Sequence, residues 1–347
     1  MLPDVRRILI IKLRAIGDVL LATPVIENVR RAYPDAHLAF LTERASEGVV
    51  DENPFLDEVI VLDRVTWQAL PVWARLREQV VFYQSLRSRG FDLAIDLFGN
   101  PRSAILTVLS GARHRVGFAF RVRRHLYNIV VSPRGGSVHE VEFNLDALRA
   151  IDIPVHTTAP LFPVSAVLRE EARAWLDAHG VRPGDRLVGL NPGGGWATKR
   201  WTPQRFAGVA DALIREYGAH ALLLWGPGER PLVDIVTRAM RSSPLILPET
   251  TLKGLGAFLS WCTLMISNDS GPMHIAAAMG IPTIGIFGPT NPALQGPYGQ
   301  GHTVVRQEGL PCLGCNLLTC RIGHLCMQTL PGEAVLRAVN DYFSQDA

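Results

Sequence analysis

Apolar residues in the first part of the chain alternate between short continuous runs and helical spacing. Residues 8–11 form a β-branched run, typical of a strand buried on both faces of a sheet. Apolar positions then return at helical spacing between residues 19 and 29. Further strand-like runs follow at 37–41, 58–62 and 91–97, with a helical pattern at 70–89. This order predicts a parallel sheet covered by helices.

The alternation weakens over residues 151–164, where three prolines lie close together, and we predict the domain linker there. It then resumes, with strand-like runs at 186–190, 221–225, 245–247, 265–267 and 283–287 and helical patterns at 165–179, 203–217, 229–241 and from 271. Two successive α/β units predict two Rossmann-like, doubly wound parallel-sheet domains that face a cleft. The expected extents are 1–160 and 161–330, with a C-terminal helix at 331–347.

Length and charge agree with this organisation. The 347 residues suit two domains of about 150 residues each. A formal net charge of +3 is too small for a dedicated nucleic-acid-binding protein, so we expect no nucleic-acid partner. Lys12 and Arg14 cut short the first apolar run and no small-residue cleavage site follows, which predicts no signal peptide. We therefore expect a cytoplasmic protein that touches a membrane only at its surface.

The loops that follow the apolar runs are the candidate site, because ligands of doubly wound sheets bind at the carboxyl ends of strands. Residues 12–18 follow the first strand, and no GxGxxG fingerprint of dinucleotide binding occurs there. Gly17 permits a close backbone approach, and Asp18 falls in the first turn of the next helix. Asp18 is a candidate catalytic carboxylate; the alternative is that it only complements the helix dipole.

A run of three glycines, Gly193, Gly194 and Gly195, follows a strand of the second domain and precedes Lys199. Successive glycines leave backbone amides accessible to an anion, and Lys199 adds charge. Only three of the 35 cationic residues are lysines, so Lys199 marks a place where a compact ammonium is required, unless base composition alone explains it. The segment predicts a phosphate site rather than an ordinary turn. Lys253 lies outside every motif and is expected to be replaceable.

Two other strand-end loops carry polar side chains. In the segment 267–274, Ser270 or Gly271 is expected to cap a helix whose N-terminus can bind phosphate. Asp269 precedes this helix, and simple capping is the alternative role for the acidic and hydroxyl side chains. The loop at 226–229 ends in Glu229, which is either a solvated residue of a helical turn or a ligand of ribose hydroxyls.

Together these loops resemble the heptosyltransferase family of lipopolysaccharide core synthesis, glycosyltransferase family 9. The matching segments are 11–24 (IKLRAIGDVLLATP), NPGGG and TKRW within 191–201, WGPGE at 225–229 and NDSGPMHIAAAMGIPTIGIFGPTNP at 268–292. The resemblance runs from residue 8 to about residue 297, and NDSGPMH…GIFGPT is its most specific part. It implies the GT-B fold, with the nucleotide-sugar donor bound mainly by the second domain.

The resemblance also implies an activity, the transfer of a heptose, with inversion, from an ADP-activated donor to the lipid-linked inner core. Such a reaction needs a carboxylate base for the acceptor hydroxyl and positive charge for the leaving diphosphate. Asp18 matches the family's proposed base, and Lys199 matches its phosphate-binding lysine. The full set expected to bind the donor is Gly17, Gly194, Gly195, Lys199, Glu229, Asp269, Ser270, Gly271 and His274. No DxD triplet that would hold Mg²⁺ occurs, so we expect a metal-independent enzyme without a catalytic cofactor.

The stretch 97–139 contains seven arginines and no Asp or Glu. Five of them are expected to bind an anionic glycolipid acceptor: Arg113, Arg115, Arg121, Arg123 and Arg124. An anionic bilayer suits the stretch as well, which predicts a peripheral protein on the cytoplasmic face of the inner membrane. Single-stranded RNA and a solvated basic face are the competing interpretations.

Four of the five cysteines, Cys312, Cys315, Cys320 and Cys326, fall in one short segment. The CxxC pair is a good half-site for zinc, and we expect a structural zinc ion there. Free or redox-active thiols and an iron–sulfur cluster stay open as alternatives, whereas stable disulfides are not expected. Cys262 lies in an apolar stretch and is expected in the core.

Two other classes of function compete with a glycosyltransferase. A nucleotide-sugar epimerase uses the same two-domain architecture, but it has no need of the basic stretch at 97–139. A non-catalytic binding protein organised around the cysteine segment is the other candidate. The phosphate-type loops in the second domain and the carboxylate loop in the first argue against it.

Overall fold

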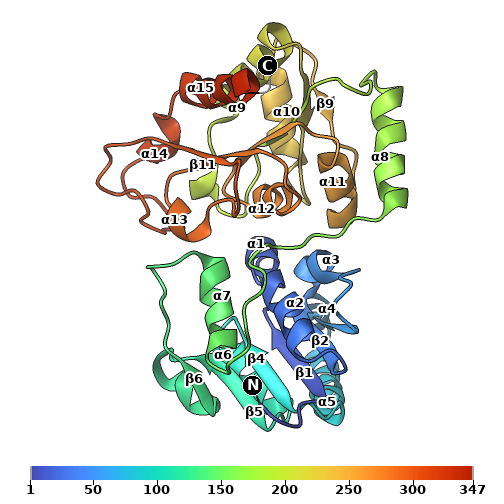
Figure 1. Cartoon of the computed structure of the whole chain (residues 1–347). Coiled ribbons are helices and arrows are strands. Elements are labelled where there is room, and N and C mark those ends of the chain that lie inside the picture. Colours follow the sequence, from blue (N-terminus) through green and yellow to red (C-terminus); the bar gives the residue numbers. More distant parts are fainter. Residues whose placement is uncertain (1, 346–347) are drawn as a thin grey trace. The chain divides into compact units, whose positions relative to one another are not determined.

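The computed structural model describes residues 2–345 and divides into two units, Met1–Phe162 and Pro163–Ala347. Each unit contains one six-stranded sheet whose strands are all parallel, with helices around it (Figure 1). The point of division lies within the proline-containing segment 151–164. The predicted α/β class, with two doubly wound parallel sheets, is confirmed.

The first sheet has the strand order β3-β2-β1-β4-β5-β6. Its strands are β1 (Arg7–Ile11), β2 (His37–Glu43), β3 (Glu58–Leu62), β4 (Leu93–Asp96), β5 (His114–Phe118) and β6 (Ile129–Val131). In the centre, Ile8 of β1 is in register with Leu38 on one side and with Leu93 on the other. The strand order reverses between β1 and β4, and this is where a doubly wound sheet binds its ligand.

The helices of the first unit are α1 (Ile16–Leu20), α2 (Thr23–Ala32), α3 (Glu47–Val50), α4 (Arg64–Ala69), α5 (Val72–Ser88), α6 (Pro101–Leu109) and α7 (Glu140–Arg149). The helical pattern predicted at 70–89 corresponds to α5, preceded by the separate short helix α4. Pro71 separates the two, because a residue before proline is held in extended backbone, as Leu70 is with a ψ of 152°.

The second sheet has the order β12-β11-β10-β7-β8-β9 and repeats the topology of the first. Its strands are β7 (Leu187–Asn191), β8 (His220–Leu223), β9 (Leu245–Ile246), β10 (Leu264–Asn268), β11 (Thr283–Phe287) and β12 (Thr303–Arg306). The switch in strand order lies between β7 and β10. The loops after these two strands are the triglycine segment and the NDSGPMH segment, so the topology brings both motifs to one edge.

The helices of the second unit are α8 (Ala166–Ala178), α9 (Pro203–Glu216), α10 (Arg230–Ala239), α11 (Leu252–Leu259), α12 (Gly271–Ala278), α13 (Pro292–Gln295), α14 (Leu325–Gln328) and α15 (Gly332–Gln345). In Figure 1, α9 lies beside α10 and α15, while α11 lies beside α8. The C-terminal helix expected at 331–347 corresponds to α15, which packs into the core of this unit. Residues 346 and 347 lie outside the described part of the chain.

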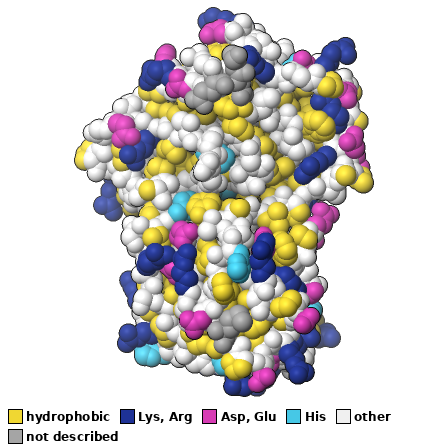
Figure 2. All heavy atoms as spheres, in the orientation of Figure 1, with side chains coloured by type: hydrophobic (Ala, Val, Ile, Leu, Met, Phe, Trp, Pro, Cys, Tyr) yellow, Lys and Arg dark blue, Asp and Glu magenta, His cyan; other side chains and the backbone are white. Residues whose placement is uncertain are grey.

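The strands β5, β6 and β12 have no counterpart in the sequence prediction, because each is short and two of them contain charged residues that break an apolar run. Within residues 2–345, no helix combines the length and the apolar composition needed to cross a bilayer. Figure 2 shows Lys and Arg side chains spread over the visible face among acidic ones, rather than gathered into one basic patch.

Candidate active site

The loop after β1 is anchored by Lys12, whose side chain is 4% exposed. Its Nζ donates to the carbonyl of Leu97 after β4 (3.0 Å) and to Glu140 (2.7 Å) and Asn144 (3.1 Å) on α7. One ammonium therefore joins both strand ends at the switch point to a third element. The sequence analysis assigned no role to Lys12, although its being one of only three lysines was a signal.

Asp18 is the third residue of α1 and is half-buried. One carboxylate oxygen accepts the backbone N–H of Ala15 at 3.0 Å, which fixes the side chain over the loop. Within the described residues the other oxygen has no hydrogen-bond partner. An oriented carboxylate with a free oxygen can accept a proton from a bound hydroxyl group. The buried backbone of Gly17 precedes it.

Asp96 closes the neighbouring strand β4 and is fully buried. Its carboxylate accepts the hydroxyls of Tyr127 (2.6 Å) and Ser103 (2.7 Å) and the backbone N–H groups of Phe98 and Gly99. Burial raises the pKa of Asp96, although all four donors favour its charged form. We assign Asp96 to holding the loop after β4 in shape, a role that no local pattern revealed.

In the second unit, two asparagines at strand ends lock the triglycine loop. Asn268, the last residue of β10, accepts the N–H of Trp201 (3.1 Å) and donates to the carbonyls of Pro192 (2.8 Å) and Gly193 (3.1 Å). Asn191, the last residue of β7, donates to the hydroxyl of Ser270 at 2.7 Å. The loops after β7 and β10 therefore form one connected network.

Lys199 and Asp269 form an ion pair at this edge, with 2.7 Å between Nζ and Oδ2. The Asp269 side chain is 4% exposed, and it also accepts the hydroxyl of Thr290 at 2.6 Å. The Lys199 ammonium lies 4.6 Å from the centre of the Trp196 ring. Lys199 comes from the loop after β7 and Asp269 from the loop after β10, so the fold unites two predicted residues that are 70 positions apart in the chain.

Glu229 reaches the same loop network. Its carboxylate accepts the N–H groups of Gly194 (2.8 Å) and Gly226 (3.0 Å). A Cβ atom on Gly193 would lie 2.3 Å from this carboxylate, so any larger residue there requires the loop or Glu229 to move. The amide of Gly194 is therefore bonded within the protein and not free for an anion, contrary to the simplest expectation for three open glycines. Gly195 is exposed at the surface of the loop.

The helix α12 begins at Gly271, as predicted, but the Ser270 side chain does not cap it. The Ser270 hydroxyl donates to the carbonyl of Asn268 (3.2 Å) and accepts from Asn191. The N–H groups at the start of α12 consequently have no side-chain cap, as in an anion-binding helix terminus. His274, also predicted, is buried in the second turn of this helix.

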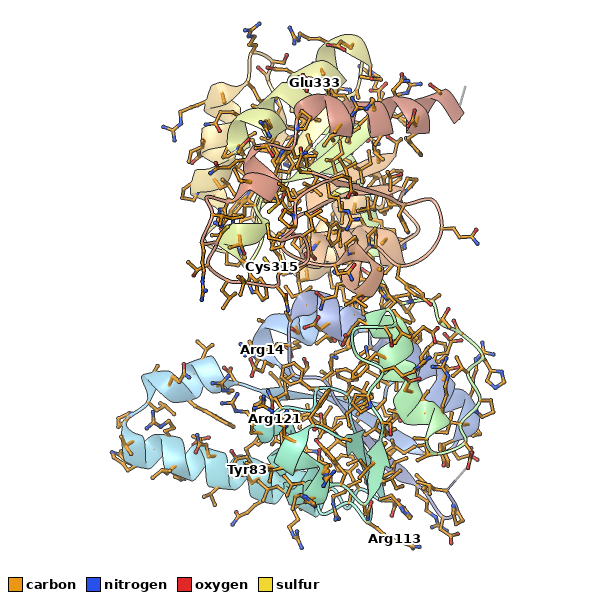
Figure 3. All side chains as sticks on the ribbon, turned by 90° about the vertical axis from the view of Figure 1, so that its left-hand side faces the viewer. Arg14, Tyr83, Arg113, Arg121, Cys315 and Glu333 are labelled. Carbon is orange, nitrogen blue, oxygen red and sulfur yellow. The ribbon has the colours of Figure 1, made fainter. Side chains whose placement is uncertain are left out.

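The five arginines predicted to bind an acceptor lie at two ends of β5. Arg113 and Arg115 are at its amino end, and the Arg115 guanidinium donates to the carbonyls of Leu126 (3.0 Å) and Ala112 (3.0 Å). Arg121 and its two companions, Arg123 and Arg124, follow the carboxyl end (Figure 3). That is the edge at which the loop of Asp18 also lies. The structure therefore does not unite the five, and the latter three lie on the side where ligands bind.

The four clustered cysteines line one cavity of about 130 Å³ but do not form the expected zinc site. Within the described chain no group of three or more His, Cys, Asp or Glu side chains is arranged to hold a metal ion. The thiols differ in surroundings: Cys326 is buried beside the core and Cys315 is exposed. Burial raises the pKa of Cys326, whereas backbone N–H groups of Ile322 and His324 lower the pKa of Cys320. The other three clustered thiols also raise the pKa of Cys326, so the four lie near one another without the arrangement of a metal site.

Cys262 is buried, as expected, and burial raises the pKa of its thiol to about 12.

The two repeated doubly wound sheets define the class of the protein as a two-domain α/β protein with the GT-B fold. The model of glycosyltransferase family 9 (heptosyltransferase) matches residues 80–325. The chain belongs to this family.

Known proteins show the same relationship over nearly the whole chain. Lipopolysaccharide heptosyltransferase 3 of Escherichia coli (strain K12) is 29% identical over 290 residues, which cover 81% of this chain and 82% of that protein. The crystal structure of a family 9 glycosyltransferase from Veillonella parvula is similar with a TM-score of 0.88 and 26% identity, over 99% of each chain. The E. coli heptosyltransferase WaaC, solved with ADP, has a TM-score of 0.73 at 22% identity, over 97% of this chain and 99% of that one.

The structural similarity of this chain to a solved epimerase is weaker than its similarity to the family 9 structures. The structure of UDP-GlcNAc 2-epimerase from Methanocaldococcus jannaschii has a TM-score of 0.50 and 11% identity, over 96% of this chain and 99% of that one. This likeness concerns the fold alone, so it does not favour an epimerase.

Proposed function

We propose that the protein transfers a heptose, with inversion, from an ADP-activated donor to the inner core of lipopolysaccharide. The observation that carries the proposal is the largely buried Lys199–Asp269 pair beside the triglycine loop and the uncapped start of α12, in a chain of family 9. A relative named as a lipopolysaccharide heptosyltransferase and a structural neighbour solved with ADP support this choice of substrates.

On the donor side, Lys199 contributes the positive charge that meets the diphosphate as it leaves. Asp269 keeps the ammonium in place at 2.7 Å, so little reorganisation is needed when charge develops. The backbone amides at Gly271 and Gly195 add fixed dipoles aimed at phosphate oxygens. Glu229 shapes the glycine loop through two of its amides and is the candidate ligand for ribose hydroxyls.

On the acceptor side, Asp18 acts as the general base. Its free carboxylate oxygen takes the proton from the acceptor hydroxyl as that oxygen attacks the anomeric carbon of the heptose. The bond from the anomeric carbon to the diphosphate breaks in the same step, and attack from the opposite face produces inversion. Arg121, Arg123 and Arg124, at the ligand-binding edge of the first sheet, are placed to bind acidic or phosphorylated groups of the acceptor.

We also propose that the reaction needs no divalent metal ion. Mg²⁺ in a transferase is held by paired carboxylates, and the sequence contains no DxD triplet. Both acidic side chains at the donor edge are engaged within the protein. Asp269 is bonded to Lys199 and Thr290 and orients the lysine, and Glu229 accepts two backbone N–H groups of the loops.

The acceptor carries a lipid anchor, so the protein must work at a bilayer surface. We infer that it acts peripherally on the cytoplasmic face of the inner membrane, where nucleotide sugars are available.

The test is mass spectrometry of lipopolysaccharide from a strain that lacks the gene, compared with the same strain carrying the wild-type or the Asp18→Asn gene. The expected result is a core truncated by one heptose, restored by the wild-type gene and not by the variant. An unchanged core, or loss of a different sugar, contradicts the proposal.

A further inference from the structure

The helices α4 and α5 of the first unit expose an apolar surface to solvent. They extend outward from their sheet in Figure 3, where Tyr83 is labelled on α5. Only Leu86 of the 17 residues of α5 is buried. The large apolar side chains that these two helices expose are Val65, Val72, Trp73, Leu76, Val80 and Val81. We call this surface, with Arg75 and Arg77, the α4–α5 face.

Apolar side chains on this face follow helical spacing. Val72, Leu76 and Val80 are four residues apart and form one stripe along α5, and Trp73 lies next to it with 71% of its surface exposed. Isolated exposed apolar residues are ordinary, but a stripe that includes a tryptophan marks an interaction surface.

The charge on this face is positive. Between residues 64 and 89 the chain has five arginines and one acidic residue, Glu78. Among the described residues, the guanidinium of Arg75 has no hydrogen-bond or ion-pair partner. An apolar stripe with tryptophan and flanking arginines is the composition of a helix that lies in the headgroup region of an anionic bilayer.

A recess of about 370 Å³ opens beside the stripe, and it too is lined by both apolar and cationic side chains. Its walls include Trp67, Leu76 and Tyr83, and its cationic lining is Arg64, Arg75 and Arg102. Arg64 and Arg102 both lie near the carboxylate of Glu43, at 3.1 and 4.0 Å, so two of the three cations share one anion and Arg75 has none among the described residues. The positive charge that Glu43 does not neutralise suits the phosphate of a lipid headgroup.

A second copy of the chain is a poorer occupant of this face. A symmetric dimer brings the same surface of both copies together, so it would place Arg75 and Arg77 close to their own counterparts. A bilayer that contains anionic lipid neutralises these cations instead.

We propose that the α4–α5 face docks the protein on an anionic lipid bilayer, with Trp73 and Leu76 entering the headgroup region and Arg75 and Arg77 contacting lipid phosphates. The choice of a bilayer rests on the proposed function, since that acceptor is lipid-anchored. The inference places the bilayer contact on α4, α5 and the recess beside them; of the arginine stretch at 97–139, Arg102 alone lines this recess.

The experiment is sedimentation of the full-length protein with vesicles, without donor or acceptor. One set contains equal parts of phosphatidylglycerol and phosphatidylcholine, and the other contains phosphatidylcholine alone. The wild-type protein is expected to bind the anionic vesicles preferentially. The Trp73→Gln and Arg75→Gln variants are each expected to bind about tenfold more weakly. Val167→Gln changes an equally exposed valine on α8 and is expected to bind like the wild type.

Two further measurements complete the test. Thermal melting checks that each variant is folded, and transfer to a deacylated, water-soluble acceptor measures the reaction without a membrane. Trp73→Gln is expected to retain that transfer.

If the wild type fails to bind anionic vesicles, or if Trp73→Gln and Val167→Gln bind equally, the docking proposal is wrong. A lipid-independent dimer that Trp73→Gln abolishes in analytical ultracentrifugation also overturns it. If the wild-type protein does not transfer heptose to the water-soluble acceptor, the proposed function is wrong. The result of the vesicle experiment still stands in that case.

Discussion

At the residue scale, the candidate site depends on a few side chains whose partners lie far away in the chain. Lys12 meets Glu140 and Asn144, Lys199 meets Asp269, and each of these cations is largely buried. A buried cation is stable only when it is paired and hydrogen-bonded, which explains why the folded protein holds each one so firmly. Asp18 differs from them, because it is half-buried and one of its carboxylate oxygens is unpartnered within residues 2–345.

Asp18→Asn tests the proposed base. The amide is the same size, but it cannot accept the proton of the acceptor hydroxyl, so turnover should fall by at least about 10²-fold. Nucleotide affinity should stay close to that of the wild type, because Asp18 belongs to the other unit. Steady-state kinetics and calorimetric titration with ADP check both expectations. Near-normal turnover in the variant would refute the assignment.

Lys199→Ala tests the charge that meets the diphosphate. An interaction that strengthens as the leaving group becomes charged affects turnover as well as affinity, so donor KM should rise and kcat should fall. The combined loss should be about 2–4 kcal/mol if water is excluded from the site. Lys199→Arg should recover only part of the activity, because the planar guanidinium directs its donors differently.

The control for Lys199 cannot be Lys253, which the sequence analysis took as replaceable. Lys253 is 6% exposed, and its ammonium donates to the carbonyl of Pro163 at 2.7 Å, so its removal would disturb a buried contact. Arg182→Ala, at an exposed position of the same unit, is the better comparison. Because Lys199→Ala leaves Asp269 without its cation, melting temperatures must accompany the kinetics. Equal activity of the 199 and 182 alanine variants would contradict the phosphate role.

At the scale of elements, the strand-end loops of the second unit are rigid because they are bonded to one another. Asn191 and Asn268 end neighbouring strands, and Glu229 bridges from the loop after β8. The anion-binding edge is therefore a preformed network of three loops, and donor binding needs little ordering of the chain.

Gly193→Ala tests how closely the loops fit. The added Cβ atom would lie 2.3 Å from the Glu229 carboxylate, which forces the loop or Glu229 to move. We expect a loss of about 1–3 kcal/mol in stability, with a weaker affinity for ADP. The matched control is Gly195→Ala, where a Cβ atom meets nothing within 4 Å. Calorimetric melting of both variants decides the matter: an equal melting temperature for the two would show that Gly193 is not constrained.

At the scale of the whole molecule, the two units repeat one sheet topology but carry different functional groups at their switch points. Each unit has its switch point between two central strands, and the chemistry at the two switch points is complementary. The first has a carboxylate with a free oxygen, and the second has a held ammonium with helix and loop amides. This division fits a reaction between an acceptor and an anionic donor.

The proposed metal independence is tested on the complete enzyme. We expect transfer to continue in EDTA at an undiminished rate, because Lys199 and the start of α12 contribute the charge that Mg²⁺ would otherwise provide. The measurement compares initial rates after EDTA treatment and dialysis, with and without added Mg²⁺. Zn²⁺ is added separately, since any effect on the cysteine segment must be kept apart. Activity that disappears in EDTA and returns with Mg²⁺ would overturn this expectation.

The amino-acid sequence by itself determined the α/β class, most of the strands and the loops that hold the candidate site. Buried parallel strands have short apolar runs in the sequence, and the loops that follow them are polar or glycine-rich. A local pattern therefore indicates both the strands and the loops. Asp18, Lys199, Asp269 and Ser270 were all found in this way. The strands it missed are short, and charged or glycine-rich sequence around them hides their burial.

Only the tertiary structure decided which polar groups meet. The Gly194 amide is bonded to Glu229, the five arginines lie at two ends of β5, and the four cysteines line a cavity without forming a metal site. The partners of Lys12 are up to 132 positions away, and those of Asp96 include Tyr127, 31 positions away. Such pairings depend on how whole elements pack, because the cost of burying a polar group is offset only by a partner that the fold brings into reach. No local periodicity contains that information.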